Sequence, residues 1–325
     1  MKFILSEEQM LFRHTVREFL EKECTPEIAR SGFNRERWAQ LAQLGAVGLA
    51  APADEGGLGL GEVDLVLLLE EAGRAALPDP LIETSMVAIP LLREAEANDL
   101  LLEAADGDVV MSVGLAGSRY VTYATDADVL LLQLGGAMFA LQRDDVKLQL
   151  MPSIDMARPV FRVEWLSEAG TKIGEGADLV EAAFDRAVLG AAAQLLGIAQ
   201  RCVEMAADYA KERHQFGKPI GSFQAIKHKL ADALLMVEFA RPVVYRAAAS
   251  IAEVSHHRER DVSMAKVYAG RAAKRATRAA LQTLGAIGYT QEHDLHIWMK
   301  RSWSLEAAWG TSDFHRDRIA DEVMG

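Results

Sequence analysis

Two short stretches hold the residues best suited to chemistry: "KERHQFGKPIGSF" at 211–223 and "QTLGAIGYT" at 282–290. Arg213 supplies a guanidinium, which can hold an oxyanion through two parallel hydrogen bonds, and Phe216 supplies a flat apolar ring. Gly285 lets another group approach the backbone closely. Helix termination explains part of this pattern, because a cation suits the last turn of a helix, a ring can fold back onto the bundle and a glycine ends the helix. Termination leaves the density of polar and aromatic residues in the first stretch unexplained.

The cysteines and the glycine-rich segment predict no metal, redox or phosphate-loop site. Cys24 and Cys202 are far apart in the sequence, and neither belongs to a Cys-x-x-Cys or Cys/His cluster. We expect both to be ordinary buried thiols. The segment "EGGLGLGE" at 55–62 follows no β-run and has no lysine at the P-loop position, so we interpret it as a turn before a helix.

The composition is that of a globular protein with a large core. Half of the 325 residues are hydrophobic and a quarter are charged. The formal charge of −12 disfavours nucleic acid and anionic membrane surfaces as partners. The N-terminus becomes acidic after a few apolar residues, and the longest nearly uncharged run, 187–199, is too short to cross a bilayer, so we expect a cytoplasmic location.

The periodicity of the apolar residues changes twice along the chain. Helical spacing begins after a capping box of Ser6 and Gln9, and a period of two marks short β-runs between about 107 and 170. The paired glycines of "LGGAM" predict a hairpin. Long helical patterns then cover 185–212, 222–255 and 261–285.

These changes divide the chain into three predicted domains. They are an N-terminal helical domain (1–106), a β domain (107–182) and a C-terminal helical bundle (183–325). Long helices joined by short connections favour an antiparallel bundle. The predicted fold class is therefore mainly α with a small antiparallel β domain.

The two stretches together resemble the C-terminal signature of the acyl-CoA dehydrogenase family. The first carries the arginine, Gln-Phe-Gly, Pro-Ile and Phe-Gln of that signature, and "QTLGAIGYTQE" carries its later Gln-x-x-Gly…Gly-Tyr-Thr-x-Glu pattern. "GTSDFHRDRIA" (310–320) is similar to the closing segment of the family, and the segments around 5–23 and 51–84 are similar to its N-terminal helical domain. The resemblance implies a helical domain, a middle β domain and a C-terminal four-helix bundle.

The resemblance also implies a reaction and a set of cofactor-binding residues. Members of the family oxidise the Cα–Cβ bond of an acyl-CoA thioester, with FAD as hydride acceptor and a glutamate as base. By this resemblance the bundle reaches the FAD diphosphate and adenosine of a neighbouring subunit. The implied cofactor-binding residues are Arg213, Phe216, Gln224, Gln282, Gly285 and Thr311.

The catalytic base of the family is missing from its two usual positions. Trp309 stands before the Gly-Thr that the base usually precedes, and an indole cannot remove a proton. We expect this indole to fill the vacated substrate cavity. At the other known position the chain has Ala187 and Val188. The nearest acids in the sequence are Glu306, Asp313 and Asp185.

The β domain departs from the family as well. Members carry a Thr-Glu-Pro…Gly-Ser-Asp segment that binds the flavin ring and phosphates, and this chain has none in "MSVGLAGSRYVTYATDADVLL". The β domain is also shortened. Both losses fall on groups that a subunit would use for its own substrate and flavin, while the motifs that face a neighbour are kept.

Three hypotheses follow from this asymmetry. In the first, the chain resembles the degenerate, non-catalytic subunit of a heterotetrameric acyl-CoA dehydrogenase and shares the FAD of a homologous catalytic partner. Such forms are associated with bulky acyl-CoA substrates, including steroid-derived thioesters, and the complex passes electrons to an acceptor. In the second, a homo-oligomer uses a displaced base such as Glu306. In the third, the chain is a cofactor-free helical-bundle interaction protein.

Overall fold

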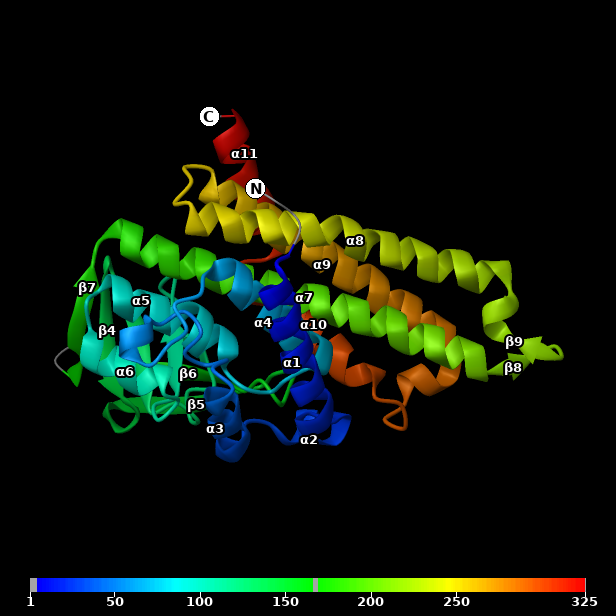
Figure 1. The fold of residues 1–325 in the computed structure, drawn as a ribbon, viewed down its shortest axis with the longest axis horizontal. Coiled ribbons are helices and arrows are strands. Elements are labelled where there is room, and N and C mark those ends of the chain that lie inside the picture. The colour runs from blue at the N-terminus through cyan, green and yellow to red at the C-terminus, as the bar shows by residue number, and fades with distance from the viewer. Residues whose placement is uncertain (1–4, 166–168, 325) are drawn as a thin grey trace.

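The N-terminal region of the chain is helical and runs from α1 near the centre of the view to α5 and α6 on its left side (Figure 1). The computed structural model describes residues 5–165 and 169–324. The predicted capping box is confirmed, since Gln9 N–H donates to Ser6 Oγ and Ser6 N–H donates to Gln9 Oε1, each at 3.1 Å. The helices are α1 (Glu7–Glu23), α2 (Pro26–Ser31), α3 (Arg35–Gln43), α4 (Glu62–Ala75), the π-helical η2 (Ile82–Ala88), α5 (Ile89–Glu94) and α6 (Asn98–Ala105).

Two small sheets form the middle of the chain. One has the strand order β1-β3-β4-β7 and the other β2-β6-β5. All pairings within these two sheets are antiparallel except that of β1 with β3, which is parallel. The strands are β1 (Met111–Gly114), β2 (Tyr120–Thr122), β3 (Val129–Leu134), β4 (Ala137–Gln142), β5 (Val146–Met151), β6 (Val160–Trp165) and β7 (Thr171–Glu175).

The strand predictions hold for the longer apolar runs. The predicted hairpin is confirmed, because β3 and β4 pair across Gly135 and Gly136, and Gly135 has a φ of 60°. Strands β2 and β7 were not predicted. They are short, and β7 exposes most of its side chains, so neither shows the alternation of buried and polar residues that marks a strand.

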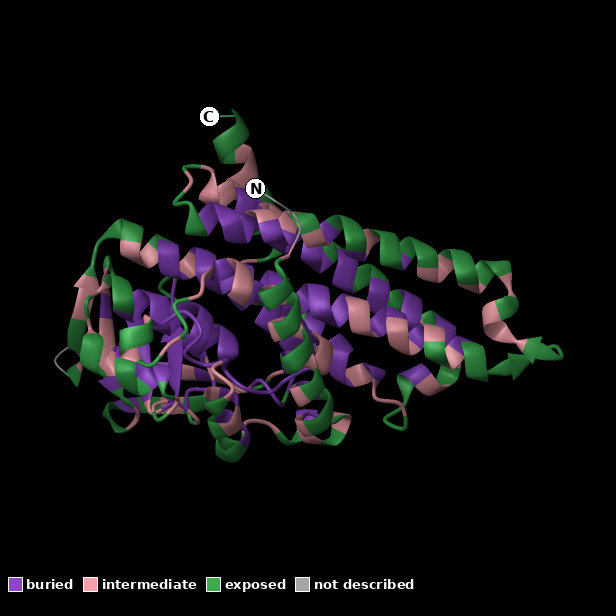
Figure 2. Cartoon of the chain, in the orientation of Figure 1, coloured by how far each residue is buried: buried purple, intermediate pink, exposed green. Residues whose placement is uncertain are grey.

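The C-terminal region is a bundle of long antiparallel helices. They are α7 (Ala177–Glu212), α8 (Gln224–Ala252), α9 (Arg258–Leu284), α10 (Leu295–Ala307) and α11 (Ser312–Met324). Helix α7 is the central element, and buried residues follow it and α9 through the molecule (Figure 2). Among the described residues α7 alone is long and apolar enough to cross a membrane, but 94% of that window is buried inside the fold.

Helices α4 and α7 touch backbone to backbone, which fixes the N-terminal helices on the bundle. A Cβ atom on Gly197 would lie 1.8 Å from the carbonyl oxygen of Glu70, and one on Gly73 would lie 2.1 Å from that of Gln194. Only glycine permits so close an approach. The two helical regions therefore share one core.

Candidate functional site

The joint between α7 and α8 is a small hairpin at the far end of the bundle (Figure 1). Its strands are β8 (His214–Gln215) and β9 (Lys218–Pro219). The two residues between them have positive φ angles, 55° at Phe216 and 80° at Gly217, as a two-residue turn of this kind requires. The sequence therefore builds a projecting tip and not a plain helix end.

The ring of Phe216 points away from the bundle. It is 92% exposed, and its only close aromatic neighbour among the described residues is Phe223, at 6.1 Å between ring centroids. The ammonium of Lys218 lies 4.5 Å from the centroid of Phe223. The interpretation that Phe216 folds back onto the bundle is wrong, because the left-handed turn aims it outward.

Five of the six predicted cofactor-binding residues meet at this corner. Arg213 ends α7 and Gln224 begins α8, while Gln282 and Gly285 lie at the end of the antiparallel α9. The guanidinium of Arg213 makes no ion pair within residues 5–165 and 169–324. Space is also open at Gly285, where a Cβ would meet no atom within 4 Å. A guanidinium, two carboxamides, a free ring and an unobstructed glycine form a donor set that fits a dinucleotide.

Thr311 is not part of this corner. It lies between α10 and α11, where its hydroxyl is 3.5 Å from the backbone N–H of Phe314. It therefore belongs to the Trp309 loop, although it does not line the cavity beside that loop.

The second site is a cavity of about 580 Å³ between the β domain and the α10–α11 loop. Its walls combine aromatic rings, small hydroxyl groups and one buried arginine. None of the described residues that line it is an aspartate or glutamate. The lining includes Leu115, Ser118, Tyr120, Thr122, Ser153, Arg158, Phe184, Trp303, Trp309 and Phe314.

Trp309 forms part of the cavity wall. The guanidinium carbon of Arg158 lies 5.0 Å from the centroid of its ring, and Arg158 is paired with the buried Glu83 at 3.0 Å. Glu83 also accepts a hydrogen bond of 2.6 Å from the Thr122 hydroxyl. The expectation that the indole fills the cavity is wrong, because Trp309 stacks against Arg158 and leaves the space open.

Buried side chains hold the backbone of this loop in one conformation. Trp309 has a φ of 51°, which is strained for a residue other than glycine. Lys266 donates to the carbonyl oxygens of Ala308 at 2.6 Å and Gly310 at 3.1 Å. Nε2 of His315 lies 3.0 Å from the carbonyl oxygen of Trp309. The carbonyl oxygens of three successive residues thus accept hydrogen bonds from side chains on α9 and α11.

Burial sets the charge of both groups that hold the loop. It lowers the pKa of the Lys266 ammonium to about 7, an effect that Glu306 opposes. Burial, together with the charge of Lys266, lowers the pKa of His315 to about 3, so this imidazole is neutral. Since Nε2 faces a carbonyl oxygen, it carries the proton, and Nδ1 accepts from the Ser263 hydroxyl at 3.2 Å.

None of the acids considered as a displaced base reaches the 580 Å³ cavity. Glu306 faces a separate cavity of about 260 Å³ between α9 and α10, where the Ser312 hydroxyl lies 3.3 Å from its carboxylate. Asp185 is buried and paired with Arg258 at 2.7 Å. Asp313 is a surface residue, with 85% of its side chain exposed.

The other residues that the sequence analysis considered for catalysis or metal binding are buried in the core. Ala187 and Val188 are fully buried in α7. Cys24 and Cys202 are free and buried, as predicted, and burial raises the pKa of each thiol to about 12. The structure brings together no group of three or more His, Cys, Asp or Glu side chains that could hold a metal ion, as far as residues 5–165 and 169–324 are concerned.

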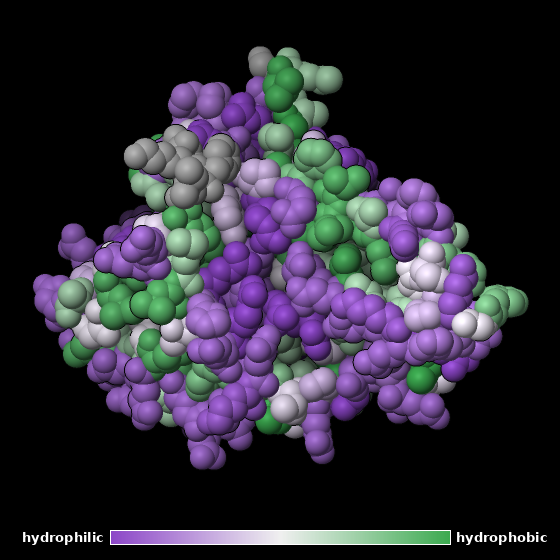
Figure 3. All heavy atoms as spheres, turned by 45° about the vertical axis from the view of Figure 1, so that its right-hand side comes forward, coloured by the Kyte–Doolittle hydropathy of each residue, from purple (hydrophilic) through white to green (hydrophobic). Residues whose placement is uncertain are grey.

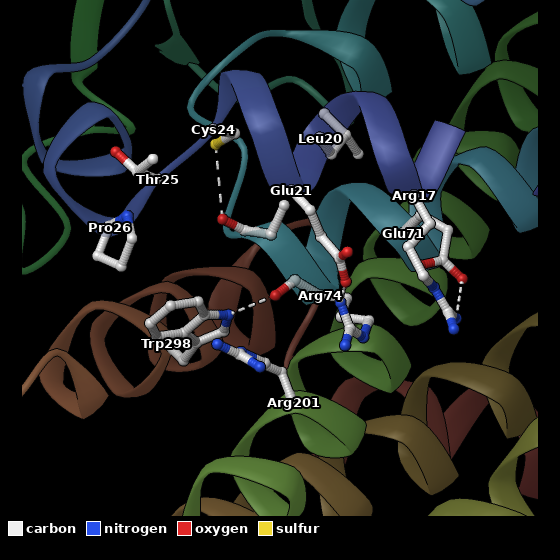
Figure 4. Close-up of a pocket in the computed structure, with 11 residues that line it drawn as sticks. Arg17, Leu20, Glu21, Cys24, Thr25, Pro26, Glu71, Arg74, Arg201 and Trp298 are labelled. Atoms are coloured by element: carbon white, nitrogen blue, oxygen red, sulfur yellow. Dashed lines mark hydrogen bonds and ion pairs between the residues drawn. The ribbon is translucent and has the colours of Figure 1, made fainter. Parts of the chain in front are cut away.

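A third cavity, of about 330 Å³, lies where α1, α4, α7 and α10 meet (Figure 4). Its arginines already have acidic partners, since Arg17 pairs with Glu71 at 2.6 Å and Arg74 with Glu21 at 2.9 Å. The indole N–H of Trp298 donates to the carbonyl oxygen of Arg74 at 2.9 Å. These contacts fasten the N-terminal helices to the bundle.

Little in the sequence pointed to the residues that hold the Trp309 loop. Lys266 lies on the buried face of α9, among the apolar residues of "MAKVYAG", and a lysine at such a position is a signal that it has a buried partner. His315 gave no comparable signal, because its partners come from α9 and from the loop itself.

Family models match both helical regions. The model of the acyl-CoA dehydrogenase N-terminal domain matches residues 6–98, and that of the C-terminal domain matches residues 174–324. The chain belongs to the acyl-CoA dehydrogenase family, whose members are FAD-dependent oxidoreductases that act on a CH–CH bond.

Individual relatives agree with this assignment and differ in length. Acyl-CoA dehydrogenase IpdE2 of Mycolicibacterium smegmatis is 34% identical over 327 aligned positions, which cover 98% of this chain and all of the relative. Probable acyl-CoA dehydrogenase YngJ of Bacillus subtilis is 27% identical over 380 positions, which cover both proteins completely. An alignment of 380 positions to a chain of 325 residues requires gaps, so YngJ is longer. The shorter length is thus shared with IpdE2.

A solved assembly has the same fold. A chain of the ChsE4–ChsE5 complex from Mycobacterium tuberculosis superposes with a TM-score of 0.88, at 25% identity, over all of this chain and 99% of the other. The predicted fold class, mainly α with a small β domain between a helical domain and a helical bundle, is confirmed.

Proposed function

We propose that this chain is the non-catalytic subunit of an FAD-dependent acyl-CoA dehydrogenase and completes the FAD site of a homologous catalytic partner. The observation that carries the proposal is the Trp309 loop. Lys266 and His315 hold this loop in place, yet it presents an indole where the family has a carboxylate, and no acid lines the cavity among the described residues. The corner that holds the other predicted cofactor-binding residues, in contrast, is largely exposed.

The corner residues have separate tasks at the partner's cofactor. The guanidinium of Arg213, which has no acidic partner among the described residues, would neutralise and orient the diphosphate, and the exposed ring of Phe216 would cover the adenine. The carboxamides of Gln224 and Gln282 would donate hydrogen bonds to oxygen atoms of the same cofactor. The cofactor bound there would supply the hydride acceptor for the acyl-CoA, and the base would come from the partner.

An exposed apolar face supports the association with a partner. Leu235 and Phe239 lie one turn apart on α8 and are 54% and 66% exposed. Hydrophobic and hydrophilic patches lie side by side on the surface seen when the hairpin end is turned forward (Figure 3). Contiguous exposed apolar surface is typical of a protein interface.

The proposal also covers the location, assembly and substrates of the complex. We expect a cytoplasmic heterotetramer whose substrates are bulky acyl-CoA thioesters, including steroid-derived ones. We expect Thr311 to contact the cofactor from the Trp309 loop, because the structure separates it from the corner. Electrons would leave through an acceptor that binds the complex.

Co-expression with a homologous dehydrogenase tests the proposal. Arg213→Ala should lower the FAD affinity of the complex by about tenfold or more, since it removes a charge-assisted pair. Lys211→Ala is the matched control, because Lys211 is a neighbouring exposed cation that pairs with Asp208 at 2.8 Å. A yellow and active protein obtained from this chain alone would refute the subunit assignment. Unchanged FAD affinity in Arg213→Ala would instead favour a cofactor-free interaction protein.

A further inference from the structure

Helix α9 carries cations and no acid along most of its length. From Val262 to Gln291 the sequence contains no aspartate or glutamate, although the whole chain has 47 of them and a formal charge of −12. The exposed cations of this stretch are Arg271, Lys274, Arg275 and Arg278. The overall composition does not account for this local excess of positive charge.

Three of these cations form a row along one side of the helix, called here the basic row. Arg271, Lys274 and Arg278 are three and four residues apart, so they lie on successive turns of one helical face. None of the three makes an ion pair with a residue in the part of the chain that the structure describes. Glu306 shares the 260 Å³ cavity with Lys274 and Arg278, but it pairs with neither. The basic row is therefore exposed and not neutralised from within the chain.

An apolar strip on α8 lies beside the basic row. Helices α8 and α9 run side by side (Figure 1), and the pair of Asp232 with Arg275, at 3.1 Å, fixes their antiparallel register. Leu235 and Phe239 follow Asp232 on α8 and are 54% and 66% exposed. Tyr268 precedes Arg275 on α9 and is 37% exposed. Because the two helices are antiparallel, these apolar side chains and the basic row share one outer surface, the α8–α9 face.

We infer that the α8–α9 face selects the partner subunit by charge. In this inference the basic row pairs with an acidic row on the homologous catalytic subunit and opposes the pairing of this chain with a second copy of itself. The inference rests on the proposed function and deepens it, because it states what makes the assembly heteromeric.

A protein partner suits the α8–α9 face better than a nucleic acid does. Leu235 and Phe239 need an apolar cover, which a phosphate backbone does not supply, and the negative charge of the whole chain repels a polyanion. The same two helices also carry Gln224 and Gln282, which the proposed function places against the partner. The face is thus continuous with the proposed interface.

Self-pairing through this face would bring like charges together. Two copies related by a two-fold axis contribute the same surface patch to their interface. Such an interface would hold two basic rows, and like charges brought together in this way are unfavourable. An acidic partner face replaces this repulsion with attraction, so the sign of the row favours one pairing and opposes the other. Because the cations are exposed, both effects should weaken as the salt concentration rises.

A pair of double variants tests the attraction to the partner. Arg271→Glu with Lys274→Glu reverses the charge of the basic row and leaves Arg278, which is nearest the cofactor-facing corner, in place. The matched control is Arg119→Glu with Lys147→Glu, which makes the same change at two exposed cations of the β domain. Assembly with a co-expressed homologous dehydrogenase is measured by light scattering and by titration at two ionic strengths, and circular dichroism verifies the helical content of every variant.

The row variant should bind the partner about tenfold or more weakly at low salt, whereas the control should change by less than about twofold. At saturating partner, the FAD affinity of the complex should be the same for the row variant and for the wild type. Equal losses in both double variants would overturn the inference, and so would an undiminished affinity of the row variant for the partner. Normal assembly with weakened FAD binding would also overturn it, because the row would then contact the cofactor.

The isolated chain gives a second readout that needs no partner. Arg271→Gln with Lys274→Gln removes the repulsion, so this variant should self-associate about fivefold or more strongly than the wild type in analytical ultracentrifugation at low salt. Equal self-association of the two proteins would refute the opposition to self-pairing. Binding of a short DNA duplex by the wild type and not by the charge-reversed variant would assign the row to a polyanion instead. If no homologous partner assembles with the wild-type chain, the proposed function fails, and the ultracentrifugation result still decides whether the row opposes self-pairing.

Discussion

Lys266 should make the stability of this protein increase between pH 7 and pH 8.5. Folding lowers the pKa of this ammonium from 10.5 to about 7, because the side chain is 1% exposed and loses its hydration. Below pH 7 both the folded and the unfolded chain hold the proton, so the penalty for burying the charge is fully present. As the pH rises through 7, the folded chain releases the proton and the unfolded chain keeps it, so the free energy of unfolding increases.

The size of the increase follows from the two pKa values. At pH 7 about half of the folded molecules are protonated, and at pH 8.5 almost none are, while the unfolded chain stays protonated. The difference in bound protons, integrated from pH 7 to pH 8.5, is roughly 1.2, which raises the free energy of unfolding by about 1.6 kcal/mol. The neutral amine keeps two N–H groups for the two carbonyl oxygens that it contacts, Ala308 and Gly310. The loop conformation should therefore survive the loss of the proton.

Urea denaturation at pH 7.0 and 8.5 measures this difference. Two other effects are smaller in this window. His315, whose pKa falls to about 3, contributes mainly below about pH 6.5. The two buried thiols ionise first in the unfolded chain, so at pH 8.5 they offset the increase by only about 0.3–0.8 kcal/mol. Lys266→Met should abolish the increase, and Lys274→Met, an exposed position on the same helix, should retain it. A wild-type protein of equal stability at the two pH values would refute the reasoning, and so would an undiminished increase in Lys266→Met.

Three further substitutions have definite expected results. Glu306→Gln should leave the turnover of the complex within about twofold of wild type, since this acid faces another cavity; loss of turnover in a steady-state assay would restore it as a base. Asp155→Asn should lower the free energy of unfolding by about 3–5 kcal/mol, because it leaves the buried Arg301 guanidinium without its acid, and a loss below about 1 kcal/mol in urea would contradict this. Gly197→Ala should destabilise by about 2 kcal/mol or more by forcing α4 and α7 apart, whereas Gly136→Ala meets no atom within 4 Å and should be milder; equal melting temperatures would show that the helix contact can yield.

Local patterns in the sequence were sufficient to predict the order and type of the main elements. The capping box, the long helical periodicities and the "LGGAM" hairpin depend on residues close together in the chain, and the sequence predicts all three. The start of the first long helix was predicted at 185, whereas α7 begins at Ala177, so the predicted boundary at 182/183 falls inside this helix. The signature at 211–223 was sufficient for the family for the same reason. The resemblance also predicts from the sequence that Trp309 stands where the family has its carboxylate, because that prediction requires only the identity of one residue.

Tertiary structure decided what those residues face. Phe216 points outward because of a turn with positive φ, and Trp309 lines an open cavity because it stacks on Arg158 from another domain. The donors that hold the Trp309 loop can be recognised only when α9 and α11 are packed together. Charge and burial depend on distances between atoms far apart in the sequence, and the periodicity of a single element does not specify those distances.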